Sequence, residues 1–166
     1  PPEQVIVLKD ADAVGKRVSE IVVECAKAAI AERGFFSIAI PGGSILKMLS
    51  GTSSGEEEEA WTSKTTLAYV NHKCVDMNDE QLATHAKAKK LFLKDWTGVN
   101  VLVLDGTDNG PVEAESYQAK LMALSNDVLP RDANGLPVFD LALIGVGDDG
   151  HVGSLYPNRD EVLVDG

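Results

Sequence analysis

The chain has 166 residues, of which 44% are hydrophobic and 25% are charged, as is typical of one globular domain. Its formal net charge of −11 argues against nonspecific binding to nucleic acid or to an anionic membrane, because such binding needs clustered basic residues. No apolar run approaches the roughly 18 residues that a membrane-spanning helix needs, so we expect no membrane insertion.

Short apolar runs alternate with helical patterns along the chain. Five runs have the length and composition of buried strands: residues 5–8, 35–40, 65–70, 99–104 and 138–144. Helices are predicted between them, from near residue 12 to residue 33 and over residues 45–49, 80–94 and 111–129. Asp10 or Asp12 can cap the first helix and Gly34 can end it, while Asn78 or Asp79 can cap the third. This order predicts an α/β fold with a doubly wound, mostly parallel, Rossmann-like sheet and helices on both faces, in one domain over residues 1–166.

Two further stretches have simple interpretations. Residues 50–59 are polar and include four consecutive glutamates at 56–59, which predicts a solvated surface loop. Cys25 falls on the apolar face of the first predicted helix, far in sequence from Cys74, so we expect a buried free thiol, no disulfide framework and a reducing compartment.

The loops that follow the strands should gather at one edge of the sheet, where ligands bind in open α/β folds. They are residues 41–44, 71–74, 105–110 and 145–154. The last of these loops contains four glycines, two acids and one histidine. His151 is a candidate general base, because imidazole titrates near neutral pH, and Asp149 could orient it or bind a sugar hydroxyl. The alternative is a solvated loop histidine without a role.

Two glycine-containing segments could bind phosphate, and one suits phosphate binding better than the other. Gly145-x-Gly147-x-x-Gly150 matches a dinucleotide fingerprint, but Asp148 and Asp149 would place negative charge where the pyrophosphate sits, and no helix pattern follows. Pro41-Gly-Gly-Ser44 is the better candidate, because free N–H groups and a hydroxyl before a helix suit a phosphate monoester; the alternative is a tight strand-to-helix turn. The histidines and cysteines lack metal-ligand spacing, so we predict no metal.

These segments resemble a known family. Residues 145–157, Gly-Val-Gly-Asp-Asp-Gly-His-Val-Gly-Ser-Leu-Tyr-Pro, look like the G-x-G-x-D-G-H-x-A-S-L-F-P signature of the 6-phosphogluconolactonases, and residues 40–47 look like their phosphate loop. The resemblance covers nearly the whole chain and is strongest to the plant and algal branch, which suggests the plastid (chloroplast) or the cytoplasm. The related glucosamine-6-phosphate deaminases share G-x-x-x-D-G-H but continue differently, so Ser154-Leu-Tyr-Pro157 favours the lactonases.

The resemblance implies hydrolysis of 6-phospho-glucono-δ-lactone to 6-phosphogluconate in the oxidative pentose phosphate pathway, with no metal or cofactor. By this analogy His151 activates the attacking water and Asp149 supports the histidine or the substrate. The residues assigned to the substrate and its phosphate are Gly42, Gly43, Ser44, Lys73, Gly147, Gly150 and Ser154.

The sequence also departs from the family pattern. Asn71-His72-Lys73 stands where the family has Asp-Glu-Arg, so lysine keeps a charge but loses the bidentate fork of arginine. Leu82-Ala83 stands where the family has Ser-Asn, and family members continue beyond residue 166, so we expect a domain that is incomplete at its C-terminus. The alternative function is therefore a catalytically inactive member, either a structural or regulatory subunit with protein partners in a larger assembly or a phosphosugar-binding module.

Overall fold

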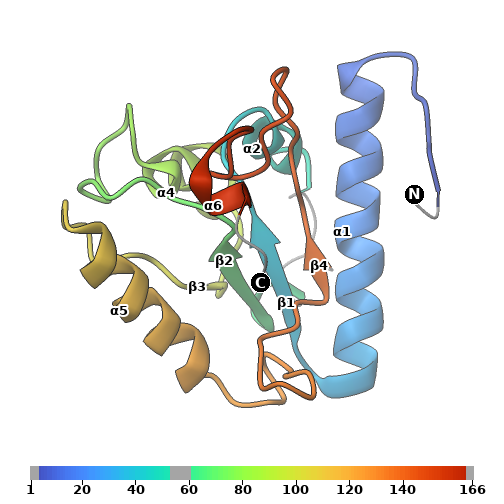
Figure 1. Ribbon diagram of the computed structural model, residues 1–166. Coiled ribbons are helices and arrows are strands. Elements are labelled where there is room, and N and C mark those ends of the chain that lie inside the picture. The colour runs from blue at the N-terminus through green and yellow to red at the C-terminus, as the bar shows by residue number, and fades with distance from the viewer. Residues whose placement is uncertain (1–3, 53–60, 164–166) are drawn as a thin grey trace.

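The computed structural model describes residues 4–52 and 61–163. Within them, four parallel strands form one sheet in the order β3-β2-β1-β4, with bounds Phe36–Ile40 (β1), Thr65–Tyr69 (β2), Asn100–Val101 (β3) and Leu141–Ala142 (β4). The helices are α1 (Ala11–Arg33), α2 (Ile45–Leu49), α4 (Thr84–Ala88), the π-helical η1 (Lys89–Leu93), α5 (Gly110–Ala123) and α6 (Asp160–Leu163). The predicted α/β class with a parallel sheet is confirmed (Figure 1). The glutamate run at 56–59 lies outside the described residues.

Helix α1 begins and ends where the sequence predicted. Asp10 is the N-cap, and its Oδ1 accepts the N–H of Ala13 at 2.8 Å. Gly34 ends the helix in the left-handed conformation, with φ +85°, and its N–H donates to the carbonyl of Ile30. Cys25 is half-buried and free, and it packs against the core from this helix.

The two central strands are covered on both faces. Every residue of β1 and β2 is buried, and successive side chains of a strand point to opposite faces. Figure 1 shows α1 beside β1 and β4, and α5 on the other side of the sheet near β2 and β3. The core on the α1 side includes Trp61, Phe92 and Trp96, whose rings meet edge to face with centroids 4.8–4.9 Å apart. Helices on both faces are thus confirmed.

Two strand predictions are wrong. Residues 5–8 form no strand; they are coil, and the side chains of Val5 and Val7 are 74% and 89% exposed. The run at 138–144 is not a fully buried strand, because only Leu141–Ala142 is a strand and it lies at the edge of the sheet. Since β4 pairs with β1 alone among the described strands, its flank is open and Ile144 is 48% exposed.

Helix and strand bounds also differ from the prediction. Asp79 caps a turn by accepting the N–H groups of Gln81 and Leu82, and the helix itself begins only at Thr84. Helix α5 ends at Ala123 instead of continuing to residue 129, because Leu124 is extended. Strand β3 covers only two of the six residues predicted at 99–104.

A charged cluster joins three elements at the amino-terminal end of the sheet. Asp140 Oδ2 accepts three hydrogen bonds, from Arg33 Nη2 at 2.8 Å and from the N–H and hydroxyl of Ser37 at 2.7 and 2.8 Å. Burial alone would raise the pKa of Asp140, but the hydrogen bonds from Arg33 and Ser37 outweigh it, so the pKa lies below the ordinary carboxyl value. The carboxylate therefore holds α1, β1 and the start of β4 together.

We expect Asp140→Asn to lower the free energy of unfolding by about 2–3 kcal/mol, because the largely buried Arg33 side chain loses its oppositely charged partner. Urea unfolding near neutral pH measures this. The matched control is Glu80→Gln, which breaks the exposed ion pair with Lys90 and should change stability by less than about 0.5 kcal/mol. Since the folded pKa of Asp140 is lowered, its contribution is present above the ordinary carboxyl pKa and is lost as pH falls through the folded value. Equal effects of the two variants would contradict this role.

Candidate active site

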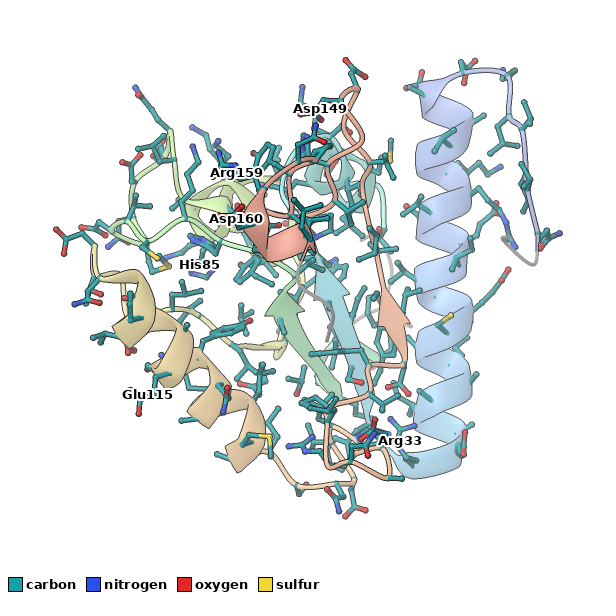
Figure 2. All side chains as sticks on the ribbon, in the orientation of Figure 1. Arg33, His85, Glu115, Asp149, Arg159 and Asp160 are labelled. Atoms are coloured by element: carbon teal, nitrogen blue, oxygen red, sulfur yellow. The ribbon has the colours of Figure 1, made fainter. Side chains whose placement is uncertain are left out.

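A cavity of about 300 Å³ lies at the carboxyl-terminal edge of the sheet. Its walls come from the loop after β1, the loop after β2 and the loop after β4, and the lining residues are Pro41, Gly42, Gly43, Ser44, Ile45, Asn71, Gly145, Val146, Gly147, His151, Gly153 and Tyr156. In Figure 2, Asp149 and Arg159 lie at this end of the sheet, and Arg33 lies at the other. Three of the four loops that were expected to meet therefore do so.

The fourth loop, residues 105–110, does not line this cavity. The buried carboxylate of Glu113 holds it instead, accepting the N–H groups of Asp105 and Thr107 at 2.9 and 2.5 Å. The hydrogen bond from the Thr107 backbone is the main reason that the pKa of Glu113 is lowered. This loop is anchored to α5 instead of contributing to the site.

His151 and Asp149 form a hydrogen-bonded pair at the cavity. Asp149 Oδ1 lies 2.5 Å from His151 Nδ1 and also accepts the backbone N–H of His151 at 3.1 Å. The side-chain hydrogen bond to His151 is the main cause that lowers the pKa of Asp149. An ionised Asp149 accepts a hydrogen bond from Nδ1–H, so the proton stays on Nδ1 and Nε2 is the basic nitrogen. Nε2 makes no hydrogen bond with any residue of the described ranges, so it is available to a ligand.

Two glycines of this loop, Gly147 and Gly150, allow the backbone to fold closely around His151. A Cβ at Gly147 would lie 2.1 Å from His151 Cε1 and 2.2 Å from Nδ1, so no side chain fits there. The Gly147 N–H donates to the carbonyl of His151 at 2.9 Å, and the N–H of Gly150 donates to the carbonyl of Gly147 at 2.9 Å. Gly150 has φ +88° and does not line the cavity. The structure thus gives both glycines a part in shaping the loop.

Another part of the cavity lining is the Pro41–Ser44 turn that leads into α2. Gly43 has φ +75°, and the N–H groups of Gly43 and Ser44 donate to no described residue. Ser44 is the N-cap of α2, but its hydroxyl makes no capping hydrogen bond. These groups can serve an anion. Among the described residues, no Lys or Arg lines the cavity, so an anion there would be held by backbone and hydroxyl groups.

The three residues after β2, Asn71, His72 and Lys73, have different surroundings. Asn71 lines the cavity, and its Nδ2 donates to Ser154 Oγ at 3.0 Å. Ser154 itself is exposed and does not line the cavity. His72 turns toward α4, where its Nε2 accepts the backbone N–H of His85 at 3.0 Å while its Nδ1 lies 2.7 Å from the carbonyl of Lys73. Lys73 is exposed and is also absent from the lining.

His72 therefore caps α4, whose own N-cap residue has no side chain that can accept a hydrogen bond. Ala83, the N-cap of α4, has no side-chain acceptor, and His85 is the second residue of the helix. Because the Lys73 carbonyl can only accept, Nδ1 of His72 must carry the proton and Nε2 must accept, which requires neutral imidazole. The ring also meets Tyr69 edge to face, with centroids 5.3 Å apart.

We expect His72→Ala to lower the free energy of unfolding by about 1 kcal/mol, the usual effect of losing a helix cap. Lys73→Ala is the control, because the neighbouring lysine side chain is exposed and its loss should matter by less than about 0.5 kcal/mol. Urea unfolding of the two variants gives the comparison. Equal stability of His72→Ala and the unmodified chain would show that the Nε2 contact does not stabilise α4.

Sequence reasoning did not single out Tyr156 or the contact between Asn71 and Ser154. The ring of Tyr156 lies against His151, with centroids 4.7 Å apart and planes 26° apart. The sequence feature that could have indicated this contact is an aromatic residue, Tyr156, five positions after His151. The Asn71 contact joins residues 83 positions apart, so no local pattern could reveal it.

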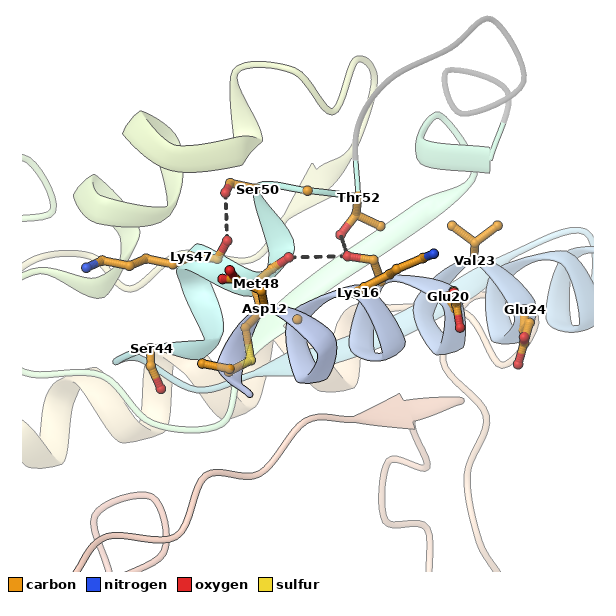
Figure 3. A pocket seen from close by; sticks show the side chains of 14 residues that line it. Asp12, Lys16, Glu20, Val23, Glu24, Ser44, Lys47, Met48, Ser50 and Thr52 are labelled. Carbon is orange, nitrogen blue, oxygen red and sulfur yellow. Dashed lines mark hydrogen bonds between the residues drawn. The ribbon is translucent and has the colours of Figure 1, made fainter. Parts of the chain in front are cut away.

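A second, larger hollow of about 820 Å³ lies between α1 and α2 (Figure 3). It shares Ser44 with the first cavity, and Ser19 links the two helices there through the Met48 carbonyl at 3.2 Å and Thr52 Oγ1 at 3.1 Å. Its titratable lining side chains are carboxylates and lysines, including Asp12, Lys16 and Glu20, and no described histidine or cysteine lines it. No described helix is long and apolar enough to cross a membrane.

Comparison with known proteins agrees with this geometry. A probable 6-phosphogluconolactonase of Schizosaccharomyces pombe is 29% identical over 164 residues, covering 93% of this chain and 61% of the relative. A probable chloroplastic 6-phosphogluconolactonase 3 of Oryza sativa subsp. indica is 32% identical over 139 residues, covering 79% of this chain and 41% of the relative. This chain thus spans less than two thirds of the length of these relatives.

Solved structures show the same fold. The 6-phosphogluconolactonase of Shewanella baltica superposes with a TM-score of 0.77 at 18% identity, over 94% of this chain and 62% of that one. The enzyme of Leishmania guyanensis gives 0.76 at 22% identity, over 92% and 63%. The family model described as glucosamine-6-phosphate isomerases/6-phosphogluconolactonase matches residues 9–165. The chain therefore belongs to the glucosamine-6-phosphate isomerase/6-phosphogluconolactonase family.

Proposed function

We propose that the protein hydrolyses 6-phospho-glucono-δ-lactone to 6-phosphogluconate. The observation that carries this proposal is that His151, which is hydrogen-bonded to Asp149, and the Gly42–Ser44 turn line the same cavity. A base and an anion-binding turn in one cavity suit a substrate with an ester carbonyl at one end and a phosphate at the other. The matched relatives whose names specify this activity support the same substrate class.

The chemistry needs one proton relay. Nε2 of His151 takes a proton from water as the water oxygen attacks the lactone carbonyl carbon, giving a tetrahedral oxyanion and imidazolium. The oxyanion then collapses, the bond from the carbonyl carbon to the ring oxygen breaks, and the imidazolium proton goes to that oxygen, which becomes a hydroxyl. Asp149 accepts a hydrogen bond from Nδ1–H throughout and is not itself protonated, so it holds the ring orientation and stabilises the imidazolium.

The Gly42–Ser44 turn would fix the remote phosphate. Binding energy from a group that does not react can position the group that does. We assign Gly42, Gly43 and Ser44 to the phosphate and keep Lys73, which follows β2, as a proposed contact from outside the cavity lining. Gly147, Gly150 and Ser154 would act through the loop that presents His151. No residue of this scheme requires a metal or cofactor.

One observation favours a second candidate function, binding of a phosphosugar without turnover. Asn71, His72 and Lys73 replace the acids and arginine of the family pattern, and His72 is engaged in capping α4. A member of this kind could serve as a subunit with protein partners. The chloroplastic relatives suggest the plastid as its location, with the cytoplasm as the alternative.

Hydrolysis of freshly generated 6-phosphogluconolactone by the full-length protein, corrected for spontaneous ring opening, tests the proposal. Acid release above the spontaneous rate is expected, with no release of ammonia from glucosamine 6-phosphate. Binding of 6-phosphogluconate by calorimetry, without any turnover of the lactone, would establish the binding module instead. Ammonia release would assign the chain to the deaminase side of its family.

A further inference from the structure

The loop that carries His151 folds back on itself immediately afterwards. Val152 and Leu155 exchange two backbone hydrogen bonds, at 3.1 and 2.9 Å, so Gly153 and Ser154 form a two-residue hairpin turn. Gly153 has φ +60° and Ser154 does not have a positive φ, which is the pattern of a type II′ turn with glycine at its first central position. This tight reversal brings Tyr156 back to the ring of His151.

The contact between the two rings is a stack. Their centroids are 4.7 Å apart and their planes differ by 26°, while both residues line the cavity. Asn158, with φ +61°, turns the chain once more, and Arg159 then lies with Cζ 5.3 Å from the centroid of the Tyr156 ring. Tyr156 is thus in contact with His151 and with the Arg159 guanidinium (Arg159 is labelled in Figure 2).

The stack with Tyr156 restrains the plane of the His151 ring, which the hydrogen bond to Asp149 alone does not fix. The hydrogen bond between Asp149 Oδ1 and His151 Nδ1 restrains one atom of the imidazole, but small rotations about the Cα–Cβ and Cβ–Cγ bonds can still tilt the ring plane. Such rotation would swing Nε2 away from the water that it must deprotonate. A flat ring held against the imidazole face opposes this motion.

We propose that Tyr156 is a positioning residue for His151, holding the imidazole plane so that Nε2 faces the cavity. The proposal rests on the hydrolytic function proposed above. Its effect is on the chemical step and not on ground-state binding, so it should appear in kcat more than in KM. The phenol hydroxyl has no part in it, because the stack uses the ring face.

The test uses Tyr156→Ala and Tyr156→Phe in the full-length protein, with Leu155→Ala as the control. Leu155 is 56% exposed, sits in the same hairpin and makes no ring contact. We expect Tyr156→Ala to lower kcat about tenfold with KM changed less than about twofold, and Tyr156→Phe to restore most of the loss. Leu155→Ala should leave kcat within about twofold.

A second readout does not depend on activity. The His151 ring proton signals, assigned by their loss in His151→Ala, should carry a ring-current shift that disappears in Tyr156→Ala and persists in Tyr156→Phe. An active wild type with unchanged kcat in Tyr156→Ala would overturn the positioning role and leave the proposed function standing. An inactive wild type would overturn the proposed function, and unchanged His151 signals in Tyr156→Ala would overturn the stack on its own.

Discussion

Replacing His151 with alanine is expected to lower kcat for lactone hydrolysis by at least about 100-fold, the usual contribution of a general base. The expectation follows from the pair with Asp149, which keeps the proton on Nδ1 and leaves Nε2 without a hydrogen bond to any described residue. KM should change little, because we propose that the phosphate is held by the Gly42–Ser44 turn and not by His151. Initial rates with freshly made lactone, after subtraction of spontaneous opening, provide the measurement.

The matched variant for this prediction is His85→Ala. His85 is half-buried, and its Nδ1 pairs with the hydroxyl of Tyr69 at 2.8 Å; its pKa is lowered, mainly by burial. It does not line the cavity, so its loss should affect stability and leave kcat within a fewfold range. An equal fall of kcat in both variants, or an unchanged rate in His151→Ala, would remove His151 from the role of base.

Gly147→Ala should be nearly as damaging, with a loss of kcat on the order of 100-fold. The added Cβ would lie 2.1 Å from His151 Cε1 and 2.9 Å from Nε2, closer than any real contact, so the imidazole must move. A displacement of about 1 Å in a catalytic group can reduce the rate by this factor. The change adds no charge and removes no hydrogen-bonding group, so the rate loss reports position alone. The same lactone assay measures it, and circular dichroism confirms that the variant is folded.

Gly145→Ala is the control for this steric argument. It adds the same methyl group two positions earlier in the same loop, but the new Cβ would meet only Ile45 Cδ1, at an ordinary 3.6 Å. We expect its kcat to fall by no more than about threefold. If both alanine variants lost activity equally, loop flexibility and not the crowding of His151 would be the cause.

The structure shows which hydrogen bonds Asn71 and His72 make. An acid at position 71 would face the Ser154 hydroxyl as an acceptor, whereas Asn71 donates to it through Nδ2. Histidine at position 72 supplies the acceptor that Ala83 cannot offer to α4. Asn71 and His72 therefore each take part in a hydrogen bond between separate loops, and the lactone assay tests whether the protein is active.

Features encoded by neighbouring residues could be predicted from the sequence. The caps of α1 at Asp10 and Gly34 depend on contacts within four residues, and both are confirmed. The pair of Asp149 and His151 is also local, since its members are two positions apart. The alternation of strands and helices predicted the parallel sheet because crossover connections leave few other arrangements.

Features that depend on which segments become neighbours needed the tertiary structure. Residues 5–8 and 138–144 have similar apolar composition, yet the first is coil and the second forms an edge strand, because only the second finds β1 to pair with. The cap from His72 to His85 and the hydrogen bond from Asn71 to Ser154 join separate loops. Sequence patterns record the preferences of a segment, whereas these contacts arise from the relative placement of strands and loops in the packed sheet, and so only the folded chain decides them.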